Sequence, residues 1–177
     1  KMSELFHLSK KREDTFIGGL SMGGYGAITN GLKYNDTFSR IAGLSSGLLI
    51  DDFSDRNKLQ NHMTSMVFGP KYTETVFGDI DKLKGSDKDY ETLVLKLKKE
   101  NANIPEFYIC CGTEDHLLEQ NRNYAEFLKD NQVPCEYVEG PGGHDWDFWD
   151  IYIKKVIDWL PLDEEEGSVT SGSIDGK

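Results

Sequence analysis

Apolar residues along the chain fall into short runs that alternate with stretches of helical periodicity. Runs rich in β-branched and aromatic residues at 15–17, 38–45, 105–112 and 135–139 predict four short strands. Helices are predicted at 23–32, 89–99, 119–130 and 146–160, where apolar positions recur with the spacing of one helix face. Strands that alternate with helices predict an α/β fold, with a parallel sheet and helices on both faces.

The pattern is less regular between the second and third predicted strands. Turn signals at 69–70, 77–79 and 84–87 divide residues 46–104 into short pieces. We expect a largely helical insertion that forms a lid or a pocket wall; the alternative is that it only covers one face of the sheet. Residues 1–162 are expected to form one domain. Residues 163–177 are acidic and then Gly/Ser-rich, which predicts a flexible tail.

The net charge of the chain limits the classes of partner that it can bind. The chain has 177 residues and a formal net charge of -11, which argues against binding to nucleic acid or to anionic membranes. No apolar run approaches the length of a membrane span, and no signal peptide is visible. We therefore expect no nucleic-acid or membrane partner, and a cytoplasmic location.

Three cysteines, Cys110, Cys111 and Cys135, are present. Cys110 and Cys111 lie in an apolar strand-like run, which predicts buried free thiols. The odd number argues against a disulfide framework. Metal binding would need histidine partners at a fitting spacing, which the sequence lacks, so no metal is expected.

The segment at 19–23 reads Gly-Leu-Ser-Met-Gly and fits the G-x-S-x-G nucleophile elbow. Such a turn presents the hydroxyl of Ser21 at a strand end and presses together the residues two before and two after it, so positions 19 and 23 are both expected to favour glycine. The following helix directs its first amides at the serine, and the Met22 amide is expected to be one oxyanion donor. Taken alone, the pattern is also typical of glycine-rich strand-to-helix turns in other α/β proteins.

An acid and a histidine follow Ser21 in the order that such a site requires. Asp115 and His144 each come just after a predicted strand, and the order Ser, Asp, His is that of the α/β-hydrolases. Sites in parallel sheets form at the carboxyl ends of strands. Asp115 alone would read as a turn former or helix cap. Its neighbours Glu114 and His116 compete for a catalytic role.

Three stretches, 18–27, 111–115 and 141–149, resemble the esterase D family of α/β-hydrolases, and the similarity spans about residues 4–160. Within that family they are most similar to bacterial tributyrin, acetyl and feruloyl esterases; S-formylglutathione hydrolases are more distant. The resemblance implies Ser21 as nucleophile, His144 as general base and Asp115 as orienting acid. It also implies that the elbow strand is the fifth of the family's sheet. The implied double displacement of a small-molecule ester, with a short-chain acyl or an aryl group, needs no metal or organic cofactor. Trp146 is expected either to pack in the core or to line the substrate pocket.

One departure from the family affects the prediction. Its members carry further strands and a loop before the elbow, and that loop supplies the second oxyanion amide. Here the elbow comes close to the first residue, so we expect the C-terminal portion of an esterase, with the N-terminal strands missing from this chain. A complementary N-terminal segment, or another copy of the chain, is expected against the elbow strand. The alternatives are an inactive fragment, an acyltransferase, or a thioesterase similar to S-formylglutathione hydrolase.

Overall fold

The computed structural model describes residues 9–61 and 71–162, which contain one parallel sheet. Its strands are β1 (Phe16–Leu20), β2 (Arg40–Leu44), β3 (Glu106–Gly112) and β4 (Cys135–Gly140), arranged in the order β1-β2-β3-β4. Gly18 pairs with Ala42, and Ile41 pairs with Phe107. Because all pairs are parallel, the four carboxyl ends lie at one edge of the sheet. The four predicted strands and the parallel sheet are confirmed.

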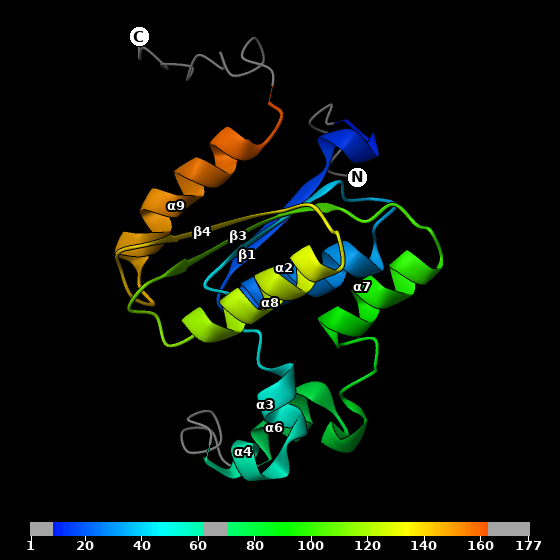
Figure 1. Cartoon of the computed structure of the whole chain (residues 1–177), viewed down its shortest axis with the longest axis vertical. Coiled ribbons are helices and arrows are strands. Elements are labelled where there is room, and N and C mark those ends of the chain that lie inside the picture. The colour runs from blue at the N-terminus through cyan, green and yellow to red at the C-terminus, as the bar shows by residue number, and fades with distance from the viewer. Residues whose placement is uncertain (1–8, 62–70, 163–177) are drawn as a thin grey trace, which may run out of the picture.

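Helices cover both faces of the sheet, as predicted (Figure 1). One face carries α2 (Met22–Lys33), α7 (Tyr90–Lys99) and α8 (Leu118–Asp130), and the other carries α9 (Trp146–Trp159). Each corresponds to a predicted helix with a shift of at most two residues at either end. Asp89 accepts a hydrogen bond from the Glu91 amide and so caps α7, which explains why that helix begins one residue later than expected.

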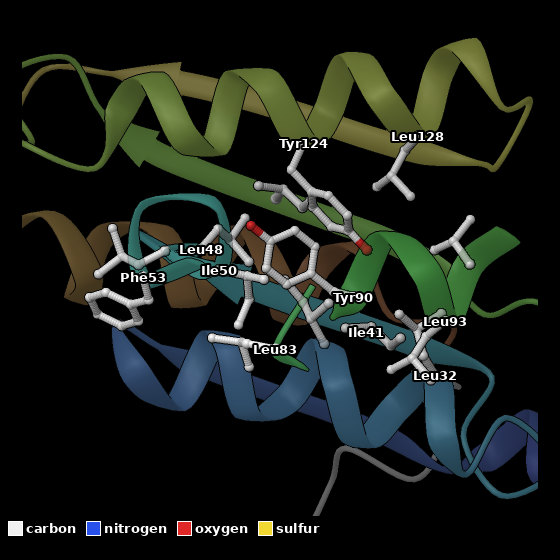
Figure 2. Packing of buried hydrophobic residues seen from close by; sticks show 14 of the residues in the cluster. Leu32, Ile41, Leu48, Ile50, Phe53, Leu83, Tyr90, Leu93, Tyr124 and Leu128 are labelled. Carbon is white, nitrogen blue, oxygen red and sulfur yellow. The ribbon is translucent and has the colours of Figure 1, made fainter. Parts of the chain in front are cut away.

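Two hydrophobic clusters hold these layers together. The larger cluster lies between the sheet and α2, α7 and α8, where Ile41, Tyr90, Tyr124 and Leu128 interdigitate (Figure 2). The smaller cluster packs Phe148 and other residues of α9 on the opposite face. Burying apolar area on both faces is the main stabilising term for a sheet of this kind.

The three thiols are free, as expected. Cys110 and Cys111 are buried in β3, and Cys135 is half-buried at the start of β4. Burial raises the pKa of each thiol to about 12, so all three stay protonated near neutral pH. A protonated buried thiol is a poor nucleophile and a poor metal ligand.

The described part of residues 46–104 is helical. It contains α3 (Ile50–Ser54), α4 (Arg56–Asn61), α6 (Tyr72–Phe77) and the 3-10 helix η2 (Ile80–Lys82), followed by α7. The shorter helices gather below the sheet in Figure 1, whereas α7 packs beside α2 on one face of it. The role of the shorter helices as a lid or pocket wall stays a prediction.

β1 is one edge of the sheet and β4 is the other. A short 3-10 helix, η1 (Arg12–Asp14), leads into β1. Although β1 lies at the edge, its residues Phe16 and Ile17 are both half-buried, and Ile17 packs against the larger cluster. The predicted tail at 163–177 lies outside the described residues. No helix in the described ranges is long and apolar enough to cross a membrane; the cytoplasmic location stays a prediction.

Candidate active site

Ser21 occupies the sharp turn between β1 and α2. Its backbone has φ 54° and ψ -124°, a conformation that non-glycine residues rarely adopt and that costs about 1–3 kcal/mol. Two hydrogen bonds hold it there, one to the last residue of β2 and one from the loop that follows β2. The Ser21 amide donates to the Leu44 carbonyl at 2.9 Å, and the Gly47 amide donates to the Ser21 carbonyl at 2.8 Å. The strained turn is therefore fastened to the end of β2.

The glycines around this turn agree with the prediction only in part. A side chain at Gly19 would place its Cβ 2.2 Å from the Gly23 carbonyl oxygen, so Gly19 is required. The expectation for Gly23 is wrong, because a Cβ there would meet nothing within 4 Å in the described structure. The close approach is made by the carbonyl of Gly23, and its Cα faces open space. Gly24 is the second required glycine, because a Cβ there would lie 2.4 Å from Ser46 Oγ.

The ends of β3 and β4 bring Asp115 and His144 to Ser21. His144 Nε2 lies 2.9 Å from Ser21 Oγ, and His144 Nδ1 lies 2.9 Å from Asp115 Oδ2 and 3.2 Å from Oδ1. A carboxylate only accepts hydrogen bonds, so we assign the proton of the neutral ring to Nδ1. Nε2 is then free to accept the hydrogen bond of the serine hydroxyl. The structure thus joins the three residues that the sequence singled out.

Asp115 is held as a buried carboxylate. Burial acts to raise its pKa, but hydrogen bonds from the Ser45 hydroxyl, the Leu117 amide and His144 outweigh that effect and leave the pKa below its usual value. The Leu117 amide donates to Asp115 Oδ1 at 2.9 Å. Asp115 is therefore ionised across the neutral pH range and can accept the Nδ1 hydrogen of His144.

The other ionisable residues next to Asp115 and His144 have contacts of their own. Asp145 accepts a hydrogen bond from the Phe148 amide at 3.0 Å and so caps α9, and Glu114 accepts one from the Gly142 amide. His116 is half-exposed, with Nδ1 3.5 Å from Asp115 Oδ1 and its ring 4.8 Å from the ring of His144. Asp115, His116 and His144 each offer one potential metal ligand within 4.8 Å of the others.

Met22 and Trp146 flank this arrangement. Met22 is the first residue of α2, so its amide has no intrahelical acceptor and is available as an anion donor. Trp146 is 72% exposed and rests edge-on against Trp149, so the expectation of core packing is wrong. The buried stripe of α9 begins at Phe148, which leaves Trp146 on the outer side of the first turn.

Ser45 and Asn121 belong to the site but were not predicted. The Ser45 hydroxyl helps to lower the pKa of Asp115, and Ser45 itself has a φ of 45° and donates its amide to the Cys110 carbonyl at 2.7 Å. The fully buried Asn121 accepts from the Ser46 amide at 3.1 Å and donates to the Ser46 carbonyl at 3.0 Å. The sequence signal for Asn121 is that it lies at helical spacing between the buried Leu117 and Tyr124, on the apolar side of α8.

Comparisons with known proteins identify the family of the chain. Residues 4–156 match the Esterase family, described as "Putative esterase". The chain belongs to this family. It is 48% identical over 157 residues to an acetyl esterase of Caldicellulosiruptor saccharolyticus, which covers 88% of this chain and 58% of the relative.

Solved structures extend the comparison to the fold. The S-formylglutathione hydrolase FrmB of Staphylococcus aureus is 34% identical with a TM-score of 0.74, covering 90% of this chain and 59% of that protein. FphF, a fluorophosphonate-binding serine hydrolase of the same organism, is also 34% identical, with a TM-score of 0.75 and coverage of 92% and 60%. The fold is therefore that of an α/β-hydrolase esterase. The chain spans about three-fifths of the length of these relatives.

Proposed function

We propose that this chain carries the catalytic residues of a serine carboxylesterase that acts on short-chain acyl or aryl esters. The observation that carries the proposal is the continuous contact from Ser21 Oγ through His144 to Asp115, with 2.9 Å at both steps. Family membership supports ester hydrolysis as the reaction. The printed name of the acetyl esterase supports a small acyl group.

The proposed reaction is a double displacement. Ser21 Oγ attacks the ester carbonyl while His144 Nε2 takes its proton, and Asp115 stabilises the imidazolium that forms. The Met22 amide is one donor to the oxyanion. His144 then gives its proton to the departing alcohol, and water releases the acid from Ser21 by the same steps in reverse order. No step in this scheme calls for a metal or an organic cofactor.

Thioesters are a second candidate class of substrate. The observation in their favour is the 34% identity to an S-formylglutathione hydrolase, with a TM-score of 0.74. The same acyl-enzyme would form, and a thiolate would leave in place of an alkoxide. Acyl transfer to a sugar hydroxyl would differ only in the acceptor that replaces water.

A complementary N-terminal segment is proposed to pack against β1. Between the end of β1 and the start of α9 lies an apolar groove of about 220 Å³, lined in part by Gly18, Leu20, Trp146, Trp149 and Ile153. Trp149 is 8% exposed, and its indole N–H has no acceptor among the described residues. The acetyl esterase relative contains a part that this chain does not match. We propose that the equivalent part fills the groove, pairs with β1 and supplies the second oxyanion donor.

Hydrolysis of p-nitrophenyl acetate, p-nitrophenyl butyrate and a formyl thioester tests both parts of the proposal. Wild type and Ser21→Ala are assayed alone and with the unmatched part of the acetyl esterase added as a separate polypeptide. We expect hydrolysis that depends on Ser21 and rises when the segment is present. Equal rates for wild type and Ser21→Ala under both conditions contradict the esterase proposal. Full activity of a monomer without the segment, or a dimer formed through β1, contradicts the proposed occupant of the groove.

A further inference from the structure

Glu114 and Gly142 link the loop that carries Asp115 to the loop that carries His144. The Gly142 amide donates to Glu114 Oε2 at 2.7 Å, and the Glu114 amide donates to the Gly142 carbonyl at 3.0 Å. One residue thus binds both polar groups of Gly142. Glu114 directly precedes Asp115, and Gly142 lies two residues before His144.

The local backbone explains why this link is needed. Gly142 has a φ of 133°, and a Cβ on Gly112 would lie 2.1 Å from the Gly142 carbonyl oxygen. The loop therefore lies directly on the end of β3, in a conformation that few residues adopt. Thr113 adds a backbone bond from its amide to the Gly140 carbonyl at 2.8 Å, and its hydroxyl donates to Glu114 Oε1 at 3.1 Å. The Glu114 carboxylate is thus itself held in place.

We propose that Glu114 is a positioning residue for His144, an inference that rests on the proposed esterase function. The carboxylate is the only side chain of the described structure that binds the Gly142 amide. Without it, the loop keeps its backbone bonds but loses one of two contacts at Gly142. His144 must stay 2.9 Å from Ser21 Oγ for proton transfer, and misplacement by about 1 Å can cost about 100-fold in rate.

A substitution series separates positioning from general stabilisation. Glu114→Ala removes the acceptor, whereas Glu114→Gln keeps an amide oxygen that can accept from Gly142. Glu126→Ala is the matched control, because Glu126 is an exposed glutamate of α8 away from both loops. The measurements are kcat and KM for p-nitrophenyl acetate, alone and with the complementary segment added, and hydrogen–deuterium exchange of residues 140–146.

We expect Glu114→Ala to lower kcat by about 10- to 100-fold with little change in KM, and to speed exchange at 140–146. Glu114→Gln should restore kcat to within about threefold of wild type, since the Gly142 bond is kept. Glu126→Ala should behave as wild type. An unchanged kcat in Glu114→Ala overturns the proposal, and so does a loss in Glu114→Gln as large as that in Glu114→Ala.

Ser21→Ala, assayed in parallel, distinguishes failure of this inference from failure of the proposed function. If wild type hydrolyses the ester no faster than Ser21→Ala, both alone and with the complementary segment added, the esterase proposal fails. In that case the hydrogen–deuterium exchange alone tests the role of Glu114. Unchanged exchange at 140–146 in Glu114→Ala overturns that role. Faster exchange in Glu114→Ala that returns to the wild-type rate in Glu114→Gln supports it.

Discussion

Replacing Asn121 by alanine tests whether its hydrogen bonds to Ser46 stabilise the loop that contacts the turn at Ser21. The buried Asn121 amide binds Ser46, and the next residue, Gly47, donates its amide to the Ser21 carbonyl. After the substitution the Ser46 carbonyl keeps the Leu48 amide, at 2.8 Å, but the Ser46 amide loses its acceptor. One unpaired buried amide costs about 1–3 kcal/mol. For a domain of this size that corresponds to a fall in Tm of about 2–12 °C.

Thermal unfolding followed by circular dichroism measures this effect, and the rate of ester hydrolysis below Tm measures its consequence at the site. Asn123→Ala is the control, because Asn123 is exposed on the same helix. We expect Asn123→Ala to unfold within about 1 °C of wild type. If Asn121→Ala does the same, Ser46 is not held by Asn121 and the reasoning is refuted.

Three further predictions concern the site and its pH dependence. Asp115→Asn should lower kcat by about 10⁴-fold, as in comparable triads, whereas Asp145→Asn should keep most activity because asparagine also caps a helix. Gly19→Ala should abolish hydrolysis, because its Cβ would lie 2.2 Å from a carbonyl oxygen, while Gly23→Ala should fold and stay active. Folding lowers the pKa of Asp115, so its ionisation stabilises the fold above the usual carboxyl pKa, and this is lost as the pH falls through the folded pKa. The Tm difference between wild type and Asp115→Asn should therefore shrink on acidification below pH of about 4.

Steady-state kinetics and unfolding scans check these three predictions. A larger kcat loss in Asp145→Asn than in Asp115→Asn, with the fold intact, would reverse their assigned roles. An active Gly19→Ala enzyme would show that the turn can open. A Tm difference that stays constant between pH 7 and pH of about 3 would show that ionisation of Asp115 does not stabilise the fold.

The sequence alone predicts the features that depend on a local pattern of residues. Ser21, Asp115 and His144 were predictable because each follows an apolar strand, and parallel strands bring their carboxyl ends to one edge. Asn121 was not predicted, because its partner Ser46 lies 75 residues away in the chain. A polar residue on the apolar stripe of a helix signals only that some buried partner exists.

The direction in which a side chain points was the second feature that the sequence pattern could not predict. The glycine spacing indicated a close approach at the elbow, but not whether a Cα or a carbonyl makes it, so position 23 was wrongly expected to favour glycine. The sequence pattern also left open whether Trp146 packs in the core or lines the substrate pocket. Asp145 caps α9, and the face of this helix that packs on the sheet begins at Phe148. Trp146 therefore lies on the exposed side of the first turn.

The most direct test of the central claim is the intact mass of the chain after reaction with a fluorophosphonate, with and without the complementary segment. Such a reagent bonds to a serine that a histidine activates. The account predicts a single adduct at Ser21, none in Ser21→Ala, and much slower labelling in His144→Ala. An adduct at another residue, or equal labelling of wild type and Ser21→Ala, contradicts the claim that Ser21 is the nucleophile.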